Sequence, residues 1–402
     1  MSQGLLSRRP AATGRAPMGW SRSARHGPGL RDRLARVDWI LLAAVLAIVC
    51  LGTLLVASAT RDSLSGLVPR HLVNIGIGLG LMITVWLIDH RMVRILAPVV
   101  YLASVVGLVL VLVMGSTVNG SKSWIDLGGF SAQPSEFAKL AVVIGMALVL
   151  AERTEGRWRG RVGSGDVFAM LLVAALPVVL IVLQPDLGTT LVLGATVFGV
   201  LAAAGTPRRW LGALVVGAVA AAVLAVALGV LEDYQVDRFL AFTDPDLDPR
   251  GAGYNVQQAR IAIGNGGLFG QGLFDGSQTR AGFVPEQHTD FVFTVAGEEL
   301  GLLGAGLLIA LLGVVLWRAL RIAVRTDDIF GRVAAAGIAC WIGFQAFQNI
   351  GMCLGIMPVT GVPLPLVSYG GSSMFAVLLA IGLLQNIHGR TAATPAGRLA
   401  LS

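Results

Sequence analysis

Charged residues are scarce in this sequence, and their scarcity excludes an ordinary soluble protein. Asp, Glu, Lys and Arg make up 13% of the 402 residues, whereas soluble domains contain roughly 25%. Hydrophobic residues account for 55% of the chain and come in long runs without charge. A bilayer core takes about 20 apolar residues per helix. The sequence therefore predicts an all-α protein with many membrane-spanning helices.

Cysteine and histidine are also few, and their positions argue against two kinds of site. The three cysteines lie inside or at the edge of apolar runs, at Cys50, Cys340 and Cys353. An odd number at such positions argues against a disulfide framework. The five histidines are far apart in sequence, at His26, His71, His90, His288 and His388. Because they show no metal-ligand spacing, we predict no metal site built from them.

The apolar runs predict ten membrane-spanning helices. They lie near 39–58, 72–88, 95–114, 136–151, 167–183, 187–204, 210–231, 291–317, 333–357 and 373–388. An even number places both termini on the same side. With the arginine-rich N-terminus in the cytoplasm, cytoplasmic segments hold 22 Lys and Arg residues and outer segments hold 7. The positive-inside rule therefore predicts a multi-pass protein of the cytoplasmic membrane with both termini cytoplasmic.

Two short tails flank the predicted membrane domain, which spans 39–390. Residues 1–38 are rich in Arg, Pro, Gly and Ser, which predicts a disordered basic cytoplasmic tail. Residues 391–402 form a second predicted cytoplasmic tail. The arginines behind the net charge of +7 lie in the first tail and between the apolar runs. They do not cluster on a folded domain, so we expect no nucleic-acid partner.

One connection is much longer than the others. Residues 232–290 form a predicted extracellular loop between the seventh and eighth helices, and loops of this length are usually functional or disordered. Its first part, 243–249, is acidic and turn-prone. Its second part, 255–272, has helix-like patches interrupted by glycines. We expect short interfacial helices there, with a merely flexible loop as the alternative.

Polar segments stand at the predicted outer ends of four helices. They are Gln133-Pro-Ser-Glu136 with Lys139 one turn further, Gln184-Pro-Asp-Leu-Gly-Thr189, Pro285-Glu-Gln-His-Thr-Asp290 and Pro363-Leu-Pro-Leu-Val-Ser-Tyr-Gly-Gly-Ser-Ser373. Ionisable groups in a membrane cost roughly 2.5–3.5 kcal/mol each on insertion scales and usually mark a cavity or pathway. The convergence of four such segments on one side predicts a polar cavity at the outer leaflet, suited to an amphiphile with an anionic head.

Each segment also has a purely structural interpretation. Asp186 and Ser135 are typical helix N-caps, and Glu136 with Lys139 has the spacing of an intrahelical ion pair. Trp124, in an outer loop, is placed either to anchor the chain at the interface or to stack on a sugar ring. Glu298 and Glu299, two turns after Asp290, receive no predicted role.

Together the segments resemble the SEDS (shape, elongation, division and sporulation) family. The matching motifs are Trp124-Ile-Asp-Leu-Gly128, Gln133-Pro-Ser-Glu136, Gln184-Pro-Asp-Leu-Gly-Thr189, Pro285-Glu-Gln-His-Thr-Asp-Phe291 and the C-terminal stretch from Asn349 to Ser373. The resemblance spans about 39–390. Leu364-Pro-Leu-Val-Ser-Tyr and Trp124-Ile-Asp-Leu favour its rod-shape (RodA-type) branch over the division-type (FtsW) branch.

This resemblance implies a peptidoglycan glycosyltransferase that polymerises lipid II, with undecaprenyl pyrophosphate as leaving group. It matches Asp290 to the family's essential carboxylate and implies a class B penicillin-binding transpeptidase as partner. We expect substrate contacts from Trp124, Glu136, Lys139, Asp186, Arg260, Glu286, His288 and Ser368. Lys139, Arg260 or a divalent cation (Mg²⁺ or Mn²⁺) is expected to stabilise the departing diphosphate. A lipid flippase and a scaffold that only recruits the transpeptidase are the alternatives.

Overall fold

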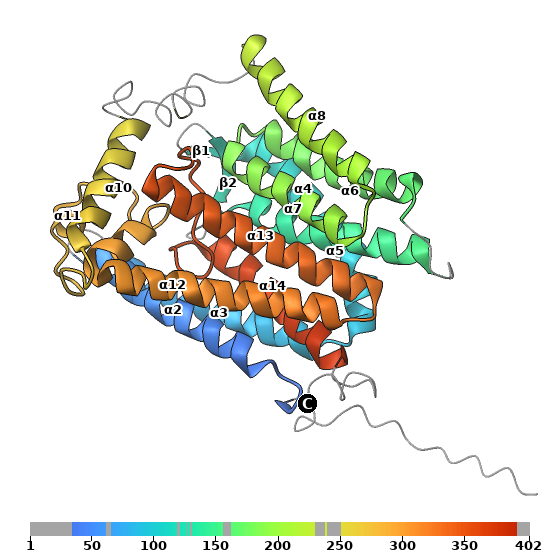
Figure 1. Cartoon of the computed structure of the whole chain (residues 1–402), viewed down its shortest axis with the longest axis horizontal. Helices are drawn as coiled ribbons and strands as arrows, with labels where there is room; N and C mark the ends of the chain where they lie inside the picture. The colour runs from blue at the N-terminus through green and yellow to red at the C-terminus, as the bar shows by residue number, and fades with distance from the viewer. Residues whose placement is uncertain are drawn as a thin grey trace, which may run out of the picture. The chain divides into compact units, whose positions relative to one another are not determined.

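The structure is a computed structural model that describes residues 34–61, 66–118, 121–126, 128, 131–155, 162–229, 238 and 251–391. The described residues from Arg36 onward belong to a single compact unit. Its longer helices are α2 (Trp39–Ala59), α3 (Leu67–Leu87), α4 (His90–Met114), α5 (Pro134–Thr154), α6 (Ser164–Val182), α7 (Leu187–Ala203), α8 (Arg208–Ala227), α12 (Val292–Arg325), α13 (Ile329–Leu354) and α14 (Gly371–Thr391). Figure 1 shows these helices packed lengthwise against one another.

The predicted all-α membrane fold is confirmed, and each of the ten predicted spans corresponds to one helix. Within the described ranges, nine helices are long and apolar enough to cross a membrane. The tenth, α7, is apolar but has only 17 residues. At 1.5 Å per residue it is about 26 Å long, slightly less than a hydrocarbon core of about 30 Å.

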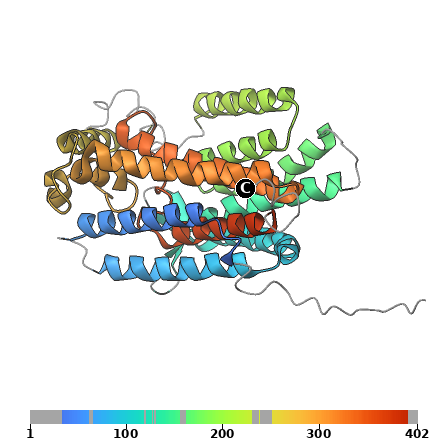
Figure 2. The same cartoon turned by 60° about the horizontal axis from the view of Figure 1, so that its bottom comes forward.

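Two polar contacts fix α12 against α2 in antiparallel order. At one end the Ser58 hydroxyl donates a hydrogen bond to the Glu299 carboxylate. At the other end Nε of Arg318 lies 2.8 Å from an Asp38 carboxylate oxygen. The sixteen helical steps from Leu302 to Arg318 rise about 24 Å, most of the roughly 30 Å of a bilayer core. Figure 2 shows α2 directly alongside α12.

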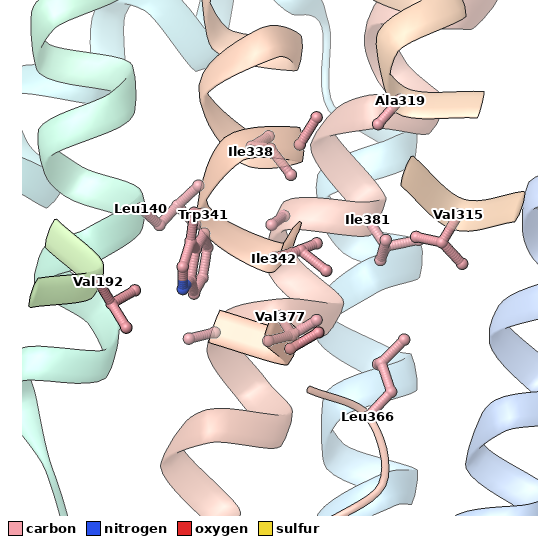
Figure 3. Packing of buried hydrophobic residues seen from close by; sticks show 14 of the residues in the cluster. Leu140, Val192, Val315, Ala319, Ile338, Trp341, Ile342, Leu366, Val377 and Ile381 are labelled. Carbon is pink, nitrogen blue, oxygen red and sulfur yellow. The ribbon is translucent and has the colours of Figure 1, made fainter. Parts of the chain in front are cut away.

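The core lies where α5, α13 and α14 meet. Figure 3 shows Trp341 of α13 beside Leu140 of α5, with Val192 of α7 on the same side and Val377 of α14 nearby. All four side chains are buried. By contrast, none of the residues of α8 is buried within this chain. The central helices therefore form the rigid core of the protein, and the helices at its periphery present apolar side chains to lipid.

A small sheet that the sequence analysis did not predict joins α4 to α5. Its strands are β1 (Ser116–Val118), β2 (Ser121–Asp126) and β3 (Ser131–Ala132), all antiparallel in the order β1-β2-β3. β1 and β3 are too short to show the alternation from which strands are predicted, and in β2 the two apolar residues, Trp124 and Ile125, are adjacent and do not alternate. The sheet holds Trp124 in the middle of β2.

The second part of the long loop before α12 contains one short helix of the kind that we expected, and another short helix follows it. They are α10 (Ala252–Gly266) and α11 (Ser277–Ala281), and α10 packs against α12 and α13. Figure 1 shows α10 and α11 beside the start of α12. Residues 232–250 of the loop, which include its first part, lie outside the described residues apart from Arg238. The same is true of 1–33 and 392–402, which hold nearly all of both predicted tails.

α12 is interrupted at Gly301, whose φ is +65°. Next to the interruption the carbonyls of Glu298 and Glu299 accept hydrogen bonds from the backbone N–H groups of Gln271 and Gly272, at 3.0 and 3.1 Å. The N–H of Leu302 donates to the carbonyl of Gly267 at 2.9 Å, and that of Leu303 donates to Leu268 at 3.2 Å. The loop after α10 thus satisfies the backbone groups that the break releases.

Candidate active site

All four predicted polar segments contribute residues to one cavity of about 190 Å³. It lies among the sheet, the start of α7, the turn before α12 and the segment before α14. Its lining residues are Ser121, Ser123, Trp124, Gln133, Pro185, Asp186, Leu187, Arg238, Glu286, Thr289, Asp290, Thr360, Gly361, Pro363, Tyr369, Gly370, Ser372 and Ser373. The cavity combines carboxylates, hydroxyls, an amide, a guanidinium and two aromatic rings.

Asp290 stands in a tight turn immediately before α12. Its N–H donates to the carbonyl of Glu286 at 3.1 Å, and Glu286 has a positive φ of 51°. Its own carbonyl accepts a hydrogen bond from the side-chain amide of Asn349 at 2.7 Å. Both ends of its backbone are therefore fixed, and its half-buried side chain reaches the cavity.

The surroundings of Asp290 favour its protonated form. Burial, together with the nearby negative charge of Glu286, raises the pKa of Asp290 from 3.8 to about 7, although Arg238 acts in the opposite direction. Desolvation disfavours a charged carboxylate, and a like charge adds to the effect. A carboxylate with a pKa near 7 is suited to general acid–base work at neutral pH.

His288 lies next to this turn but does not line the cavity. Its ring packs against Tyr369 with centroids 5.8 Å apart, and its carbonyl accepts a hydrogen bond from the Tyr369 N–H at 2.9 Å. Burial lowers the pKa of the His288 imidazole. His288 therefore connects the Asp290 turn to the segment before α14, and Tyr369 forms part of the cavity wall.

Asp186 is both a helix cap and a cavity residue. One carboxylate oxygen accepts from the Thr189 N–H at 2.9 Å, and the other accepts from the Thr189 hydroxyl at 2.8 Å. The amide of Gln133 lies 3.4 Å from the second oxygen. Burial raises the pKa of Asp186. The predicted N-cap is confirmed, and the same carboxylate faces the cavity.

Trp124 forms part of the cavity wall on the side of the sheet. Its side chain is half-buried, so one surface is supported by the protein and another faces the cavity. The strand that carries it is tied to the α6–α7 connection, because the Ser121 hydroxyl donates to the carbonyl of Gln184 at 2.9 Å. A flat aromatic surface held in this way can accept the apolar face of a sugar ring.

Glu136 and Lys139 do not line the cavity. The Lys139 ammonium is fully buried, 2.6 Å from Glu136 and 2.8 Å from the side-chain oxygen of Gln345. It also lies 5.5 Å from the centre of the Trp341 ring. To meet a phosphate, the ammonium would have to leave all three partners. The predicted intrahelical pair is confirmed, whereas a contact with phosphate stays a prediction.

Two further predicted contact residues also lie away from the cavity. Arg260 is exposed on α10, beside Gly355 at the end of α13. Ser368 is buried, and its hydroxyl accepts a hydrogen bond from the N–H of Leu364 at 2.8 Å. Ser368 therefore shapes the turn that carries Tyr369. The structure thus brings Trp124, Asp186, Glu286 and Asp290 together and leaves Glu136, Lys139, Arg260, His288 and Ser368 behind or beside them.

Several cavity residues were not predicted from the sequence. Arg238 is one of few cations in the long loop before α12, but a single arginine in an acidic stretch carries no recognisable pattern. Gln133 and Tyr369 belong to motifs that were noted, yet neither was selected. Thr360 and Gly361 also belong to a quoted motif, the stretch from Asn349 to Ser373, but neither was predicted to be a site residue. A Cβ at Gly361 would lie 3.3 Å from an Asp290 carboxylate oxygen, so a glycine leaves that carboxylate room.

The carboxylates of the cavity are potential ligands for the expected divalent cation. In the part of the chain that the structure describes, no three His, Cys, Asp or Glu side chains come close enough to hold a metal ion. Asp186, Glu286 and Asp290 nevertheless line the same cavity. Mg²⁺ is usually held by one or two carboxylates together with substrate phosphates and water. The donor set is therefore compatible with an ion that arrives with a phosphorylated substrate.

Comparison with known proteins assigns the chain to a family. Residues 34–393 match the FtsW/RodA/SpoVE family, described as cell cycle protein. The chain is 38% identical to the probable peptidoglycan glycosyltransferase FtsW of Halothiobacillus neapolitanus, with 91% of this chain and 89% of the relative covered. It is also 38% identical to the peptidoglycan glycosyltransferase MrdB of Escherichia coli, with 88% and 93% covered.

Solved structures agree with the sequence relatives. A chain from a structure described as coordinating polymerisation and crosslinking in a peptidoglycan synthase complex has a TM-score of 0.74 and 37% identity, with 89% of this chain and 99% of that chain covered. The rod shape determining protein RodA of Thermus thermophilus has a TM-score of 0.64 and 36% identity, with 88% and 96% covered. The chain therefore belongs to the FtsW/RodA/SpoVE (SEDS) family.

Proposed function

We propose that this peptidoglycan glycosyltransferase polymerises lipid II on the outer face of the cytoplasmic membrane, with Asp290 as general base. One observation carries the proposal. The Asp290 carboxylate lines the cavity, and its pKa is raised to about 7 by burial and by Glu286. A base that titrates near the working pH accepts a proton effectively and still releases it after the reaction.

The chemistry requires few protein groups. Asp290 takes the proton from the 4-hydroxyl of the acceptor N-acetylglucosamine while that oxygen attacks C1 of the donor N-acetylmuramic acid. The C1–oxygen bond to undecaprenyl pyrophosphate breaks, and the configuration at C1 inverts. Pyrophosphate leaves without a proton donor, unlike the alcohol expelled by glycosidases. Arg238 lines the same cavity, which supports a role for its guanidinium beside the departing diphosphate.

The orientation and the partner follow from separate observations. The excess of Lys and Arg in predicted cytoplasmic segments supports cytoplasmic termini and an extracellular cavity. Reporter fusions after Thr206 and Arg325 should then indicate the cytoplasm, and fusions at Gly251 the exterior. A cytoplasmic signal at Gly251 would place the cavity on the cytoplasmic side and contradict the proposed orientation.

The similarity to a chain of a peptidoglycan synthase complex supports a class B penicillin-binding transpeptidase as partner.

We assign the chain to cell elongation and not to division. The support is local, in Leu364-Pro-Leu-Val-Ser-Tyr and Trp124-Ile-Asp-Leu, because relatives of the two types are equally similar at 38% identity. Expression in cells depleted of their own rod-type or division-type enzyme distinguishes the two. Restored rod shape supports the assignment, and restored septation in place of rod shape contradicts it.

The decisive experiment uses the purified full-length chain with its transpeptidase partner and fluorescent lipid II. Asp290→Asn keeps size and polarity but removes the proton acceptor, so the rate of glycan formation should fall by about 10²–10⁴-fold. Asp275→Asn is the matched control, because this aspartate is exposed on the outer loop and does not line the cavity. Near-normal product from Asp290→Asn would exclude the general base, and a wild-type chain without product would favour a scaffold or flippase.

A further inference from the structure

A buried glutamate in α12 organises the outer loop and has no part in the chemistry above. The carboxylate of Glu298 is fully buried. One oxygen accepts from the Gln278 N–H at 2.7 Å and from the Ser277 hydroxyl at 3.2 Å. The other accepts from the N–H of Thr279 at 2.9 Å and from its hydroxyl at 2.7 Å. Four donors from three consecutive residues thus converge on one carboxylate.

The chain fits tightly around this carboxylate. A Cβ at Gly276 would lie 2.8 Å from a Glu298 oxygen, so the loop approaches as closely as a glycine allows. The backbone of Glu298 also accepts from the N–H of Gln271 at 3.0 Å. Side chain and backbone of Glu298 therefore hold two separate points of the loop. A buried charge with four donors is well satisfied, and removing it would leave those donors unpaired.

The loop fixed by Glu298 leads directly to the turn that carries Asp290. The carbonyl of Thr279 accepts a hydrogen bond from the side-chain amide of Gln287 at 3.0 Å, and the same amide donates to the carbonyl of Ala59 at 3.1 Å. Gln287 is buried and lies in the turn three residues before Asp290. A continuous set of hydrogen bonds thus runs from Glu298 through Thr279 and Gln287 to the Asp290 turn.

Asp290 depends on this support, because the hydrogen bonds that fix it in the structure are made by its backbone. Its N–H donates to Glu286, and its carbonyl accepts from Asn349. The direction of its carboxylate is consequently set by the conformation of residues 286–290. Small displacements of a reacting group are costly, and about 1 Å can reduce a rate by on the order of 10²-fold.

We propose that Glu298 is a positioning residue for glycosyl transfer: it fixes residues 277–279, which hold Gln287 and thereby aim the Asp290 carboxylate into the cavity. The inference rests on the proposed function of Asp290 and adds a residue that touches no substrate. Glu298 acts only through the loop. Its loss should affect turnover more than substrate binding, since Trp124 and Asp186 keep their own supports.

The test is Glu298→Gln in the purified full-length protein with fluorescent lipid II. Glutamine has the same shape but keeps only one accepting oxygen, so part of the loop is released. We expect kcat to fall between about tenfold and a hundredfold, with KM for lipid II changed by less than about twofold. The acidic limb of the pH–rate profile should move to lower pH, because a loosened turn hydrates Asp290. A purely structural role predicts normal kcat in the folded fraction and an unmoved pH profile.

Matched variants make the result independent of stability. Asp38→Asn removes a buried charge at the opposite end of α12, where it pairs with Arg318, and should leave kcat and the pH profile of folded protein unchanged. Thr279→Val keeps the shape of Thr279 and removes only its hydroxyl bond to Glu298. It provides a milder test if Glu298→Gln does not fold, and a normal kcat in this variant would then overturn the proposal.

A double-mutant cycle tests the route. Gln287→Met removes both amide donors, and if Glu298 acts through Gln287, the losses in kcat from the two single variants should not add in the double variant. Additive losses would overturn the inference. Asp290→Asn separates this failure from failure of the proposed function. An inactive Asp290→Asn beside a fully active Glu298→Gln rejects only the positioning role, and an active Asp290→Asn rejects the base itself.

Discussion

The side-chain amide of Asn349 donates to two backbone carbonyls at once, that of Asp290 and that of Val362, each at 2.7 Å. Asn349 belongs to α13, one of the most buried helices, and is itself fully buried. A single amide thus joins the turn before α12 to the segment that follows α13. Both segments contribute residues to the cavity wall, so the buried helix α13 fixes their position relative to each other at Asp290.

The raised pKa of Asp290 predicts a specific pH dependence. A base is active when deprotonated, so the rate should rise with pH and level off above about 7. The negative charge of Glu286 contributes to this pKa, and Glu286→Gln removes it. The pKa of Asp290 should then fall, and the acidic limb should move to lower pH. Rates measured from pH 5 to 9 check this, and a limb that stays in place or moves upward contradicts the prediction.

Trp124 should contribute to substrate affinity and little to turnover. We expect Trp124→Ala to raise KM for lipid II by about threefold to tenfold, equivalent to roughly 1 kcal/mol, with Trp124→Phe close to wild type. Trp317→Ala is the control, because this exposed tryptophan lies on α12 and packs against arginines instead of the cavity. If Trp124 only anchors the chain at the interface, the two alanine variants should have the same KM.

The ion pair of Lys139 and Glu136 should be more important for stability than for chemistry. Lys139→Met leaves the Glu136 charge buried and unpaired, which typically costs about 3–5 kcal/mol. The double variant Glu136→Gln with Lys139→Met should recover much of that loss. Thermal unfolding of the detergent-solubilised protein measures the stability of both variants. Unchanged stability combined with lost activity in Lys139→Met would instead support a direct contact with phosphate.

The break in α12 requires glycine at 301. Its φ of +65° is unfavourable for other residues, and a Cβ there would collide with the amide nitrogen of Gly270. Gly301→Ala should therefore destabilise the protein by at least about 2 kcal/mol. Gly306→Ala, in the same helix with open space around it, should be neutral or stabilising by up to about 1 kcal/mol. Equal unfolding temperatures for the two variants would show that the break is not required.

The helical framework could be predicted because its signal is local. Each span is a continuous apolar run, and hydropathy alone identified all ten, including α7 with its 17 residues. The sheet was missed because two of its strands have only 3 and 2 residues, and the third, with 6, carries its apolar residues side by side at Trp124 and Ile125. The break at Gly301 was also missed, since a glycine within an apolar run is common in membrane helices. The reason for a glycine at this position is evident only from the structure, in which the loop after α10 packs against the break in α12.

The candidate site was predictable as far as its residues belong to helix ends. Asp186 and Asp290 stand at such ends, and the structure brings both to one cavity. Lys139 shows the limit of this reasoning. Its spacing from Glu136 is equally compatible with a pair and with a phosphate ligand, and only the position of Gln345, 206 residues away, gives the ammonium a third polar neighbour. Contacts between distant segments, such as Glu298 with Thr279, leave no trace in a single sequence.

The interruption of α12 also bears on the order in which the chain is assembled. The N–H groups of Leu302 and Leu303 would lack partners in a membrane without the carbonyls of Gly267 and Leu268. Those carbonyls precede α12 in the sequence, so the ribosome makes the partner before the helix that needs it. A circular permutation that places α10 after α14 would reverse this order. In such a chain α12 would have to enter the membrane before the carbonyls of Gly267 and Leu268 had been synthesised.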